Sequence, residues 1–284
     1  MMNPSFKKKV NKGLLVFGRV LILLFFLIVV VAPIYWLFIT SLKLPKDIAT
    51  LDLQYWPKNP TLTNYAELWK STQFPAYLRN SILVSVISGI IVVIVSIGGG
   101  YALARYRFRM KKVTLIGFLV SQMIPITLIL VPVFLIFSKL GLNDTLTSLV
   151  VLYVILNTPF CVITMQGFFM NIPTSIEEAA TIDGCGRMDV LTKIVLPIML
   201  PGIIAVFIFA FIGAWNDLLG GVMLINTEVK KTIPVGLSAY VGQFSINWGE
   251  MTAGGMLALI PSAVLFAIAQ KFIVEGLTAG AVKG

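Results

Sequence analysis

The sequence predicts an all-α membrane protein with six transmembrane helices. Of the 284 residues, 58% are hydrophobic and only 12% are charged, and the mean hydropathy is +0.94. A soluble domain has no way to bury this much apolar surface, so a soluble enzyme is excluded. The apolar runs show no alternating strand pattern, and a backbone that crosses lipid must satisfy its own hydrogen bonds. Helices are therefore the expected spanning elements.

Six apolar runs are long enough to cross a bilayer, which requires about 20 helical residues. We expect the helices at residues 20–42, 81–104, 113–137, 146–166, 202–225 and 251–273. Together with their loops they form a single transmembrane domain over residues 1–284. The basic stretch before the first run resembles a signal peptide, but the length of the run favours an uncleaved span.

The distribution of Lys and Arg predicts the orientation. With the N-terminus in the cytoplasm, 14 of the 22 basic residues fall in inner segments. The outer eight are Lys43, Lys46, Lys58, Lys70, Arg79, Lys139, Lys230 and Lys231. The cluster at 105–112 holds five positive charges between the second and third spans. The positive-inside rule therefore places both termini in the cytoplasm of a protein of the plasma (inner) membrane.

Proline or glycine interrupts most of the later spans. Pro125 and Pro132 lie in the third span, Pro159 in the fourth, Gly213 in the fifth and Pro261 in the sixth. Such residues kink helices. They are also common in ordinary membrane helix packing, so the sequence leaves open whether they are hinges around a pathway.

Several kinds of chemistry are excluded by composition. The chain has no histidine, which rules out imidazole metal sites and Ser/His/Asp triads. The net charge of +10 follows from membrane topology and not from a nucleic-acid-binding pattern. Cys161 and Cys185 are too few for a disulfide framework. We therefore predict no catalytic residue and no metal site in this chain.

The longest predicted cytoplasmic connection, residues 167–201, carries the most specific polar pattern. Thr174 and Ser175 each precede a glutamate by three residues, which predicts capping boxes at a helix start. Gly184 is well placed to end that helix in a left-handed cap. A second helix is expected at 188–195, ended by Pro197. The small side chains of the first helix suit close docking into another protein better than lipid anchoring.

The spacing of this segment resembles the EAA loop of permease subunits in ATP-binding-cassette (ABC) importers. Glu178-Ala179-Ala180 is followed by three residues, Gly184, nine residues and Ile194-x-Leu196-Pro197. Asn80-Ser81, the segment 101–108, Trp215-Asn216-Asp217 and the closing segment 276–284 are similar to the carbohydrate branch, as in the maltose permease MalG. Cys185 departs from the alanine that is usual there. We call residues 167–201 the EAA loop below.

The resemblance implies an ABC importer type I permease fold with a MetI-like core. It also implies three kinds of partner: a second permease subunit in a heterodimer, two cytoplasmic ATP-binding subunits and an extracytoplasmic sugar-binding protein. The sequence agrees, because it contains no Gly-x-x-x-x-Gly-Lys-Ser/Thr phosphate loop. ATP and magnesium are then expected in the partner ATPase, with no cofactor, no catalysis and no nucleic-acid contact in this chain.

The same resemblance assigns roles to particular positions. It implies that the first helix docks into the ATPase, with Glu178 capping and orienting it, and that residues 226–250 touch the binding protein. The tail, Val282-Lys283-Gly284, either reaches the ATPase or frays as termini commonly do. The expected ATPase-coupling residues are Glu178, Ala179, Ala180, Asp183, Gly184, Ile194, Leu196 and Pro197.

Asp217 is the acid expected inside or at the edge of a span, where unpaired burial costs about 3 kcal/mol. One interpretation places Trp215, Asn216 and Asp217 near a sugar path, because rings, amides and carboxylates suit hydroxyl-rich ligands. The other is structural packing near the outer end of the fifth span. Gln122 and Asn157 are weaker path candidates of the same kind.

The predicted function is that of a permease subunit for ATP-driven import of sugars or oligosaccharides. The alternative is a secondary transporter or channel acting alone, for which inverted repeats and several buried charges are expected. The sequence shows one candidate acid and no clear repeat. An intramembrane enzyme would need a nucleophile or paired acids that no motif here supplies. The particular sugar does not follow from the sequence.

Overall fold

The chain is helical almost throughout the part that the computed structural model describes, which is residues 4–48, 50, 52–242 and 246–281. Four helices are long and apolar enough to cross a membrane, or up to six if two bent helix pairs each count as one span. The all-α membrane fold is therefore confirmed. The chain divides into two units, residues 1–71 with 240–256 and residues 72–239 with 257–284, and each is described by itself.

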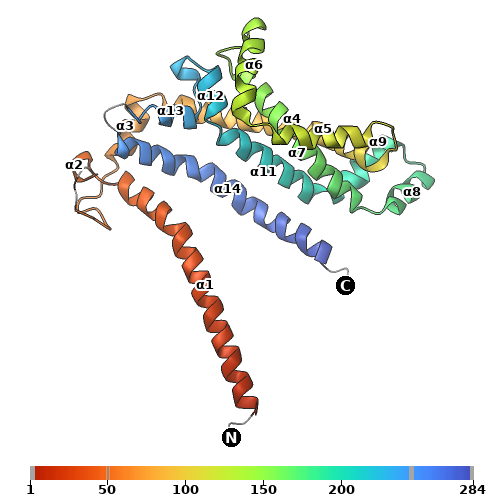
Figure 1. Cartoon of the computed structure of the whole chain (residues 1–284), viewed down its shortest axis with the longest axis horizontal. Coiled ribbons are helices and arrows are strands. Elements are labelled where there is room, and N and C mark those ends of the chain that lie inside the picture. The colour runs from red at the N-terminus through yellow and green to blue at the C-terminus, as the bar shows by residue number, and fades with distance from the viewer. Residues whose placement is uncertain (1–3, 49, 51, 243–245, 282–284) are drawn as a thin grey trace. The chain divides into compact units, whose positions relative to one another are not determined.

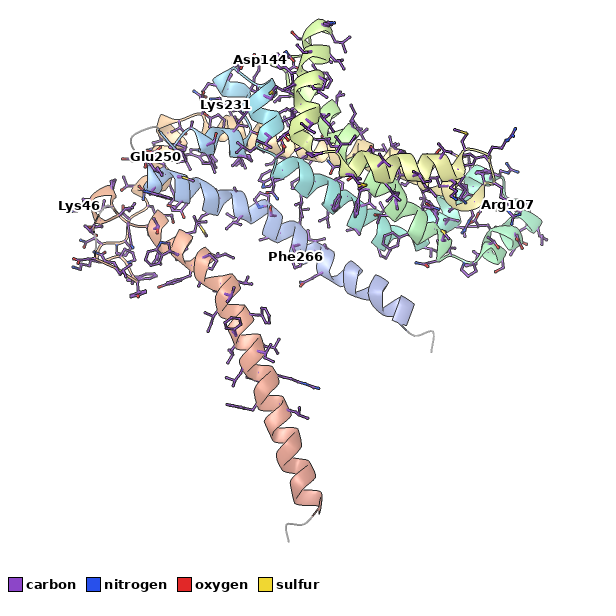
Figure 2. All side chains as sticks on the ribbon, in the orientation of Figure 1. Lys46, Arg107, Asp144, Lys231, Glu250 and Phe266 are labelled. Atoms are coloured by element: carbon purple, nitrogen blue, oxygen red, sulfur yellow. The ribbon has the colours of Figure 1, made fainter. Side chains whose placement is uncertain are left out.

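The first unit contains α1 (Pro4–Ser41), α2 (Pro45–Ile48), α3 (Thr63–Ser71) and the first turns of α14 (Trp248–Ala281). The Asn64 amide ties α3 to the end of α1 by donating to the carbonyl oxygens of Ser41 and Lys43, both at 2.8 Å. Side chains from Leu15 to Val31 are exposed around α1, as Figure 2 shows. This apolar surface requires lipid or another protein as a neighbour.

The second unit is built on three helices, α4 (Phe74–Arg105), α7 (Leu146–Met170) and α11 (Leu200–Trp215), which pack against one another (Figure 1). Small residues make this packing close. A Cβ added to Gly100 would lie 2.9 Å from the backbone nitrogen of Gln166, and one added to Gly89 would lie 2.9 Å from the Phe207 ring. Glycine at these positions therefore sets the distance between the helices.

The predicted span at 113–137 is corrected by the structure, because it consists of two helices. These are α5 (Lys111–Met123) and α6 (Ile126–Lys139), with a bend of 100° that is visible in Figure 1. Ile124, between them, is extended at φ −79° and ψ 121°. A residue before proline is disfavoured in the helical region, so Pro125 stops α5. Pro132, in contrast, stays inside α6.

The predicted span at 202–225 is also broken. The helix α11 ends at Trp215, and a separate helix, α12, covers Leu219–Leu224. Between them the Asp217 carboxylate accepts a hydrogen bond from the Gly221 N–H at 3.1 Å, which satisfies a free donor near the start of α12. The helices α4, α7 and α14 are longer than the predicted 81–104, 146–166 and 251–273. Polar residues such as Asn80 and Glu250 continue α4 and α14, and residues 167–170 continue α7.

Asp144 fastens the turn between α6 and α7 to the segment after α12. It has a left-handed backbone (φ 58°), which Asp tolerates better than most residues. Its carboxylate accepts hydrogen bonds from the Asn226 and Thr227 N–H groups and pairs with Lys230 Nζ at 3.0 Å. The bonds from Thr227, supported by Lys230, hold the pKa of Asp144 well below its usual range. The turn therefore keeps its charge, and these contacts, down to acidic pH.

The segment after α12 contains η2 (Glu228–Lys230) and α13 (Ile233–Ser238), and it is bound to the start of α4. The Asn80 amide donates to the Val229 and Lys231 carbonyl oxygens at 2.9 and 3.0 Å. The Ser81 hydroxyl accepts a hydrogen bond from the Ile233 N–H at 2.8 Å. The Asn80-Ser81 pair thus holds the first part of the 226–250 connection in place.

We predict that Gly100→Ala lowers the free energy of unfolding by about 1–3 kcal/mol, because the new methyl group overpacks the contact between α4 and α7. Gly98→Ala is the matched control, since a Cβ there meets nothing within 4 Å. Thermal unfolding of the purified protein in detergent measures both. Equal midpoints for the two variants would show that α4 and α7 are not in close contact at Gly100.

Candidate coupling site in the EAA loop

The first helix of the EAA loop, α8, covers Thr174–Ile182. Gly184 follows it with φ 86°, and its N–H donates to the Thr181 carbonyl oxygen at 3.1 Å. The left-handed glycine cap predicted from the sequence is therefore present. The predicted capping boxes are wrong, because the N-cap is Pro173 and no side chain caps the helix start. Glu177, the first of the two adjacent glutamates in α8, has a different partner.

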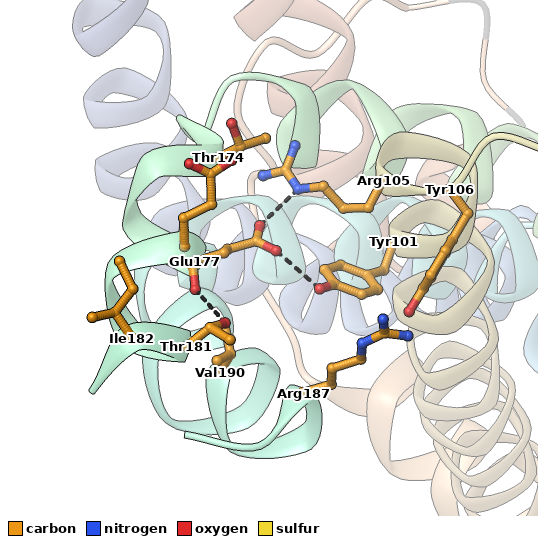
Figure 3. A pocket seen from close by; sticks show the side chains of 10 residues that line it. Tyr101, Arg105, Tyr106, Thr174, Glu177, Thr181, Ile182, Arg187 and Val190 are labelled. Atoms are coloured by element: carbon orange, nitrogen blue, oxygen red, sulfur yellow. Dashed lines mark hydrogen bonds and ion pairs between the residues drawn. The ribbon is translucent and has the colours of Figure 1, made fainter. Parts of the chain in front are cut away.

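That glutamate, Glu177, is bound to the end of α4 (Figure 3). Arg105 Nε donates to its Oε1 at 2.7 Å, and Tyr101 Oη donates to its Oε2 at 2.9 Å. Arg105 also donates through Nη2 to the Ile172 carbonyl oxygen at 2.9 Å. The Arg105 and Glu177 side chains are 12% and 13% exposed, so solvent screens this ion pair little.

The sequence prediction assigned the orienting role to Glu178, whereas in the structure Glu177 makes the anchoring contacts. Glu178 and Ala179 are exposed, and Asp183 and Gly184 are exposed at the C-terminal end of the helix. Ala180, in contrast, is 6% exposed and packs in the hydrophobic core of the second unit. Thus α8 has an inner face around Ala180 and an outer face that leaves the other motif residues free to meet a partner.

The second helix of the EAA loop begins at Arg187 and does not end before Pro197. It runs through α9 (Arg187–Asp189), the π-helical turn η1 (Val190–Val195) and α10 (Leu196–Ile198). Pro197 is the second residue of α10 and lies within this helix. Ile194 and Leu196 are half-buried. At Met199 the chain bends by 78° into α11.

A cavity of about 450 Å³ opens between α8, the end of α4 and the start of the second helix. Its lining includes Tyr101, Arg105, Tyr106, Glu177, Glu178 and Arg187. The Arg187 guanidinium lies over the Tyr106 ring, 6.0 Å from its centroid (Figure 3 shows the two side chains). Polar groups from α4, α8 and α9 therefore converge at the EAA loop, although 72 residues separate Arg105 from Glu177.

The candidate path residues make internal contacts. The Asp217 carboxylate accepts a hydrogen bond from Tyr153 Oη at 2.9 Å, in addition to that from Gly221. Trp215 is 3% exposed, stacks on Phe211, and donates from its ring nitrogen to the Ala258 carbonyl oxygen at 3.3 Å. These contacts favour the packing interpretation for both residues.

The other path candidates differ in exposure. Asn216 ends α11 and is exposed. Asn157 donates to the Tyr153 carbonyl oxygen at 2.8 Å, and its Oδ1 would lie 2.6 Å from a Cβ added to Gly213. Gln122, which is exposed, donates to the Leu156 carbonyl oxygen at 3.3 Å, close to the break between α5 and α6. The tail residues Val282, Lys283 and Gly284 lie outside the described residues.

The described residues form four helices long and apolar enough to span a membrane, two further helix pairs that are each bent at a short break, and an EAA loop that connects α7 to α11. This is the architecture of a multi-pass transport permease. Residues 91–278 match the family described as "Binding-protein-dependent transport system inner membrane component". The chain belongs to this family, whose members are permease subunits of ABC importers.

Two relatives match across most of their length. The diacetylchitobiose uptake system permease protein DasC of Streptomyces coelicolor is 33% identical over 89% of this chain and 92% of its own. The sulfoquinovosyl glycerol transport system permease protein SmoH of Agrobacterium fabrum is 33% identical over 89% of this chain and 88% of its own.

A solved structure shares the fold. It is the crystal structure of a bacterial ABC transporter involved in the import of the acidic polysaccharide alginate, and one of its chains matches with a TM-score of 0.77. The match has 21% identity and covers 95% of this chain and 98% of that chain. The ABC importer permease fold predicted from the sequence is confirmed.

We predict that Asp217→Ala lowers the free energy of unfolding by about 1–3 kcal/mol, because the Tyr153 hydroxyl and the Gly221 N–H lose their common acceptor. Asn216→Ala, at the exposed neighbouring position, should leave it unchanged. Thermal unfolding in detergent measures both. A stable Asp217→Ala protein that has lost transport would instead support the sugar-path interpretation.

Proposed function

We propose that this permease imports a sugar or a sugar derivative and forms half of the translocation pathway. The family match over residues 91–278, together with the EAA loop, carries this proposal. The carbohydrate class is supported by the relatives, since DasC and SmoH are named for diacetylchitobiose and sulfoquinovosyl glycerol. The related crystal structure belongs to an alginate importer.

The assembly that we propose has a second permease subunit, two cytoplasmic ATP-binding subunits and an extracytoplasmic sugar-binding protein. The family description names a binding protein as a requirement for transport. The sequence supports a separate ATPase, because it lacks a phosphate-binding loop. In this proposal the chain is non-catalytic, and ATP and magnesium bind in the partner.

We place both termini and the EAA loop in the cytoplasm, following the distribution of basic residues. The exposed side of α8, with Glu178, Ala179, Asp183 and Gly184, then docks into the ATPase, and the tail at 282–284 reaches the same interface. The connection at 226–250 lies outside and meets the binding protein. Closing of the ATPase dimer pushes α8 and rocks the helices above it between inward-open and outward-open states.

Among the candidate path residues, Asn216 and Gln122 are the better placed, because their side chains are exposed and suit a hydroxyl-rich ligand. Asp217 and Trp215 support the path indirectly by holding the junction between α11 and α12. A stand-alone transporter remains the competing function, and the composition of the native complex distinguishes the two.

Purification of the native complex tests this function. We expect an ATPase and a second permease to co-purify with the tagged chain in mild detergent. The cognate binding protein, screened by thermal shift against mono- and oligosaccharides, should be stabilised by a sugar. A chain that purifies without an ATPase yet transports would contradict the proposal. Stabilisation by amino acids or metal ions instead of sugars would contradict the substrate class.

The two faces of α8 should respond differently to the same substitution. Ala180→Leu overpacks the inner face, at a cost of about 1–3 kcal/mol, and displaces α8 without changing its outer face. We expect the ATPase to stay bound while sugar uptake per ATP hydrolysed falls. Ala179→Leu, on the exposed side, should weaken ATPase binding itself.

The measurements are the amount of ATPase that co-purifies and the ratio of uptake to hydrolysis in proteoliposomes. Wild-type values for both variants would refute the assignment of α8 as the coupling helix.

A further inference from the structure

The helix α8 reaches the second unit's helical core by two routes. Its backbone packs against η1, and Ala180 enters the hydrophobic core around Val190 and Val195. The other route is polar and leads to α4 through Glu177. Because α4 packs against both α7 and α11, a bond to its end connects α8 directly to the three-helix core.

The backbone connections on either side of α8 provide a weaker mechanical link to the helical core. On one side α8 continues from α7 through a turn that ends at Pro173. On the other side Gly184 and Gly186 separate it from Arg187, where the next helix begins. Glycine-containing connections bend readily, so a push on α8 would be partly absorbed there. A direct bond to α4 bypasses both connections.

The contacts at Glu177 are suited to holding α8 firmly against α4. One guanidinium donates both to the Glu177 carboxylate and to the Ile172 carbonyl oxygen, and this planar fork fixes its direction. The Tyr101 ring packs edge-on against Phe169, with centroids 5.3 Å apart, which holds its hydroxyl toward the carboxylate. Both carboxylate oxygens are thereby engaged (Figure 3).

A second ion pair in the EAA loop offers the contrast. Asp189 and Lys193 are 2.6 Å apart, but their side chains are 47% and 73% exposed and both lie on the same helix. This pair connects no separate elements. Like Arg105 and Glu177, these two residues form an ion pair of a basic and an acidic side chain. Because the pair is exposed and lies within one helix, it does not hold two helices together.

We propose that Arg105 and Tyr101 are positioning residues that clamp α8 to α4 through Glu177, so that the two helices move as one rigid body during transport. The clamp rests on the proposed function, in which α8 receives the stroke of the ATPase. It explains why the residue before the EAA motif faces inward, and why an arginine of the basic 105–112 cluster is half-buried.

Spin labels at Ser175 on α8 and Gly98 on α4 test the clamp by the distance between them; a Cβ added at position 98 meets nothing within 4 Å. Both positions are exposed. Cys185→Ala removes the partly exposed native thiol, and Cys161 is buried. The complete complex, with its ATPase, is measured in nanodiscs without nucleotide and after trapping with ATP and vanadate. The unmodified clamp should give one narrow distance that is the same in both states.

Glu177→Gln keeps the size of the side chain and removes its charge, and Tyr101→Phe removes one donor. We expect both to broaden the distance distribution and to make it differ between the two states, Glu177→Gln more strongly. The charge swap Arg105→Glu with Glu177→Arg should restore a narrower distribution than either single change. Asp189→Asn should resemble the wild type.

Two results would overturn the clamp. One is a wild-type distance that changes between the two states, because α8 would then move relative to α4. The other is a Glu177→Gln complex that keeps the narrow, state-independent distance. Loss of the ATPase from the wild-type complex would instead overturn the proposed function, so the two failures are distinguishable. A Glu177→Gln chain that fails to assemble is replaced in this comparison by Tyr101→Phe.

Discussion

The close contact of α4 with α7 and α11 is the constraint on which the rest of the second unit depends. Within lipid, apolar side chains gain little by burial against one another, so helix association relies on shape and on small residues that let backbones approach. Gly100 and Gly89 have no room for a Cβ. Ser85, Ser88 and Ser96, on the same helix, are fully buried. This contact makes the three helices a base against which the EAA loop is held.

The coupling site follows from that base. The EAA loop leaves at the end of α7 and returns into α11, so the packed helices fix both of its ends. The end of α4 supplies Arg105 and Tyr101 between them. As a result Glu178, Ala179, Asp183 and Gly184 are exposed at α8, while Ala180 and Glu177 attach α8 to the rest of the second unit. In the function that we propose, these two faces let α8 receive a force from the ATPase and transmit it to the helices.

Much of this arrangement could be predicted from the sequence because it depends on local pattern. Apolar run length indicated the membrane helices, glycine chemistry indicated the end of α8, and the spacing from Glu178 to Pro197 indicated the family. The break at Pro125 could not be distinguished from Pro132, Pro159 or Pro261, which remain inside helices. Whether a proline breaks a membrane helix depends on how neighbouring groups satisfy the freed backbone, which is not a local property.

The partners of Glu177 could not be predicted from the sequence, because they too depend on how distant segments pack. Capping preferences describe residues three or four positions apart, whereas Arg105 and Tyr101 are brought to Glu177 by the packing of α4 with α7. In the structure the Glu177 carboxylate accepts hydrogen bonds from Arg105 and Tyr101, and no side chain caps the start of α8. The same holds for Asp217, which the sequence showed as an isolated acid and which is satisfied by Tyr153 from another helix.

We propose that this chain conducts a sugar but does not power its movement. Reconstitution tests it most directly, with radiolabelled sugar uptake measured in vesicles that contain the chain alone and in vesicles that contain the complete complex with ATP and binding protein. We expect concentrative uptake by the complex and none by the chain alone, with or without ion gradients. Accumulation of sugar by the isolated chain would contradict it.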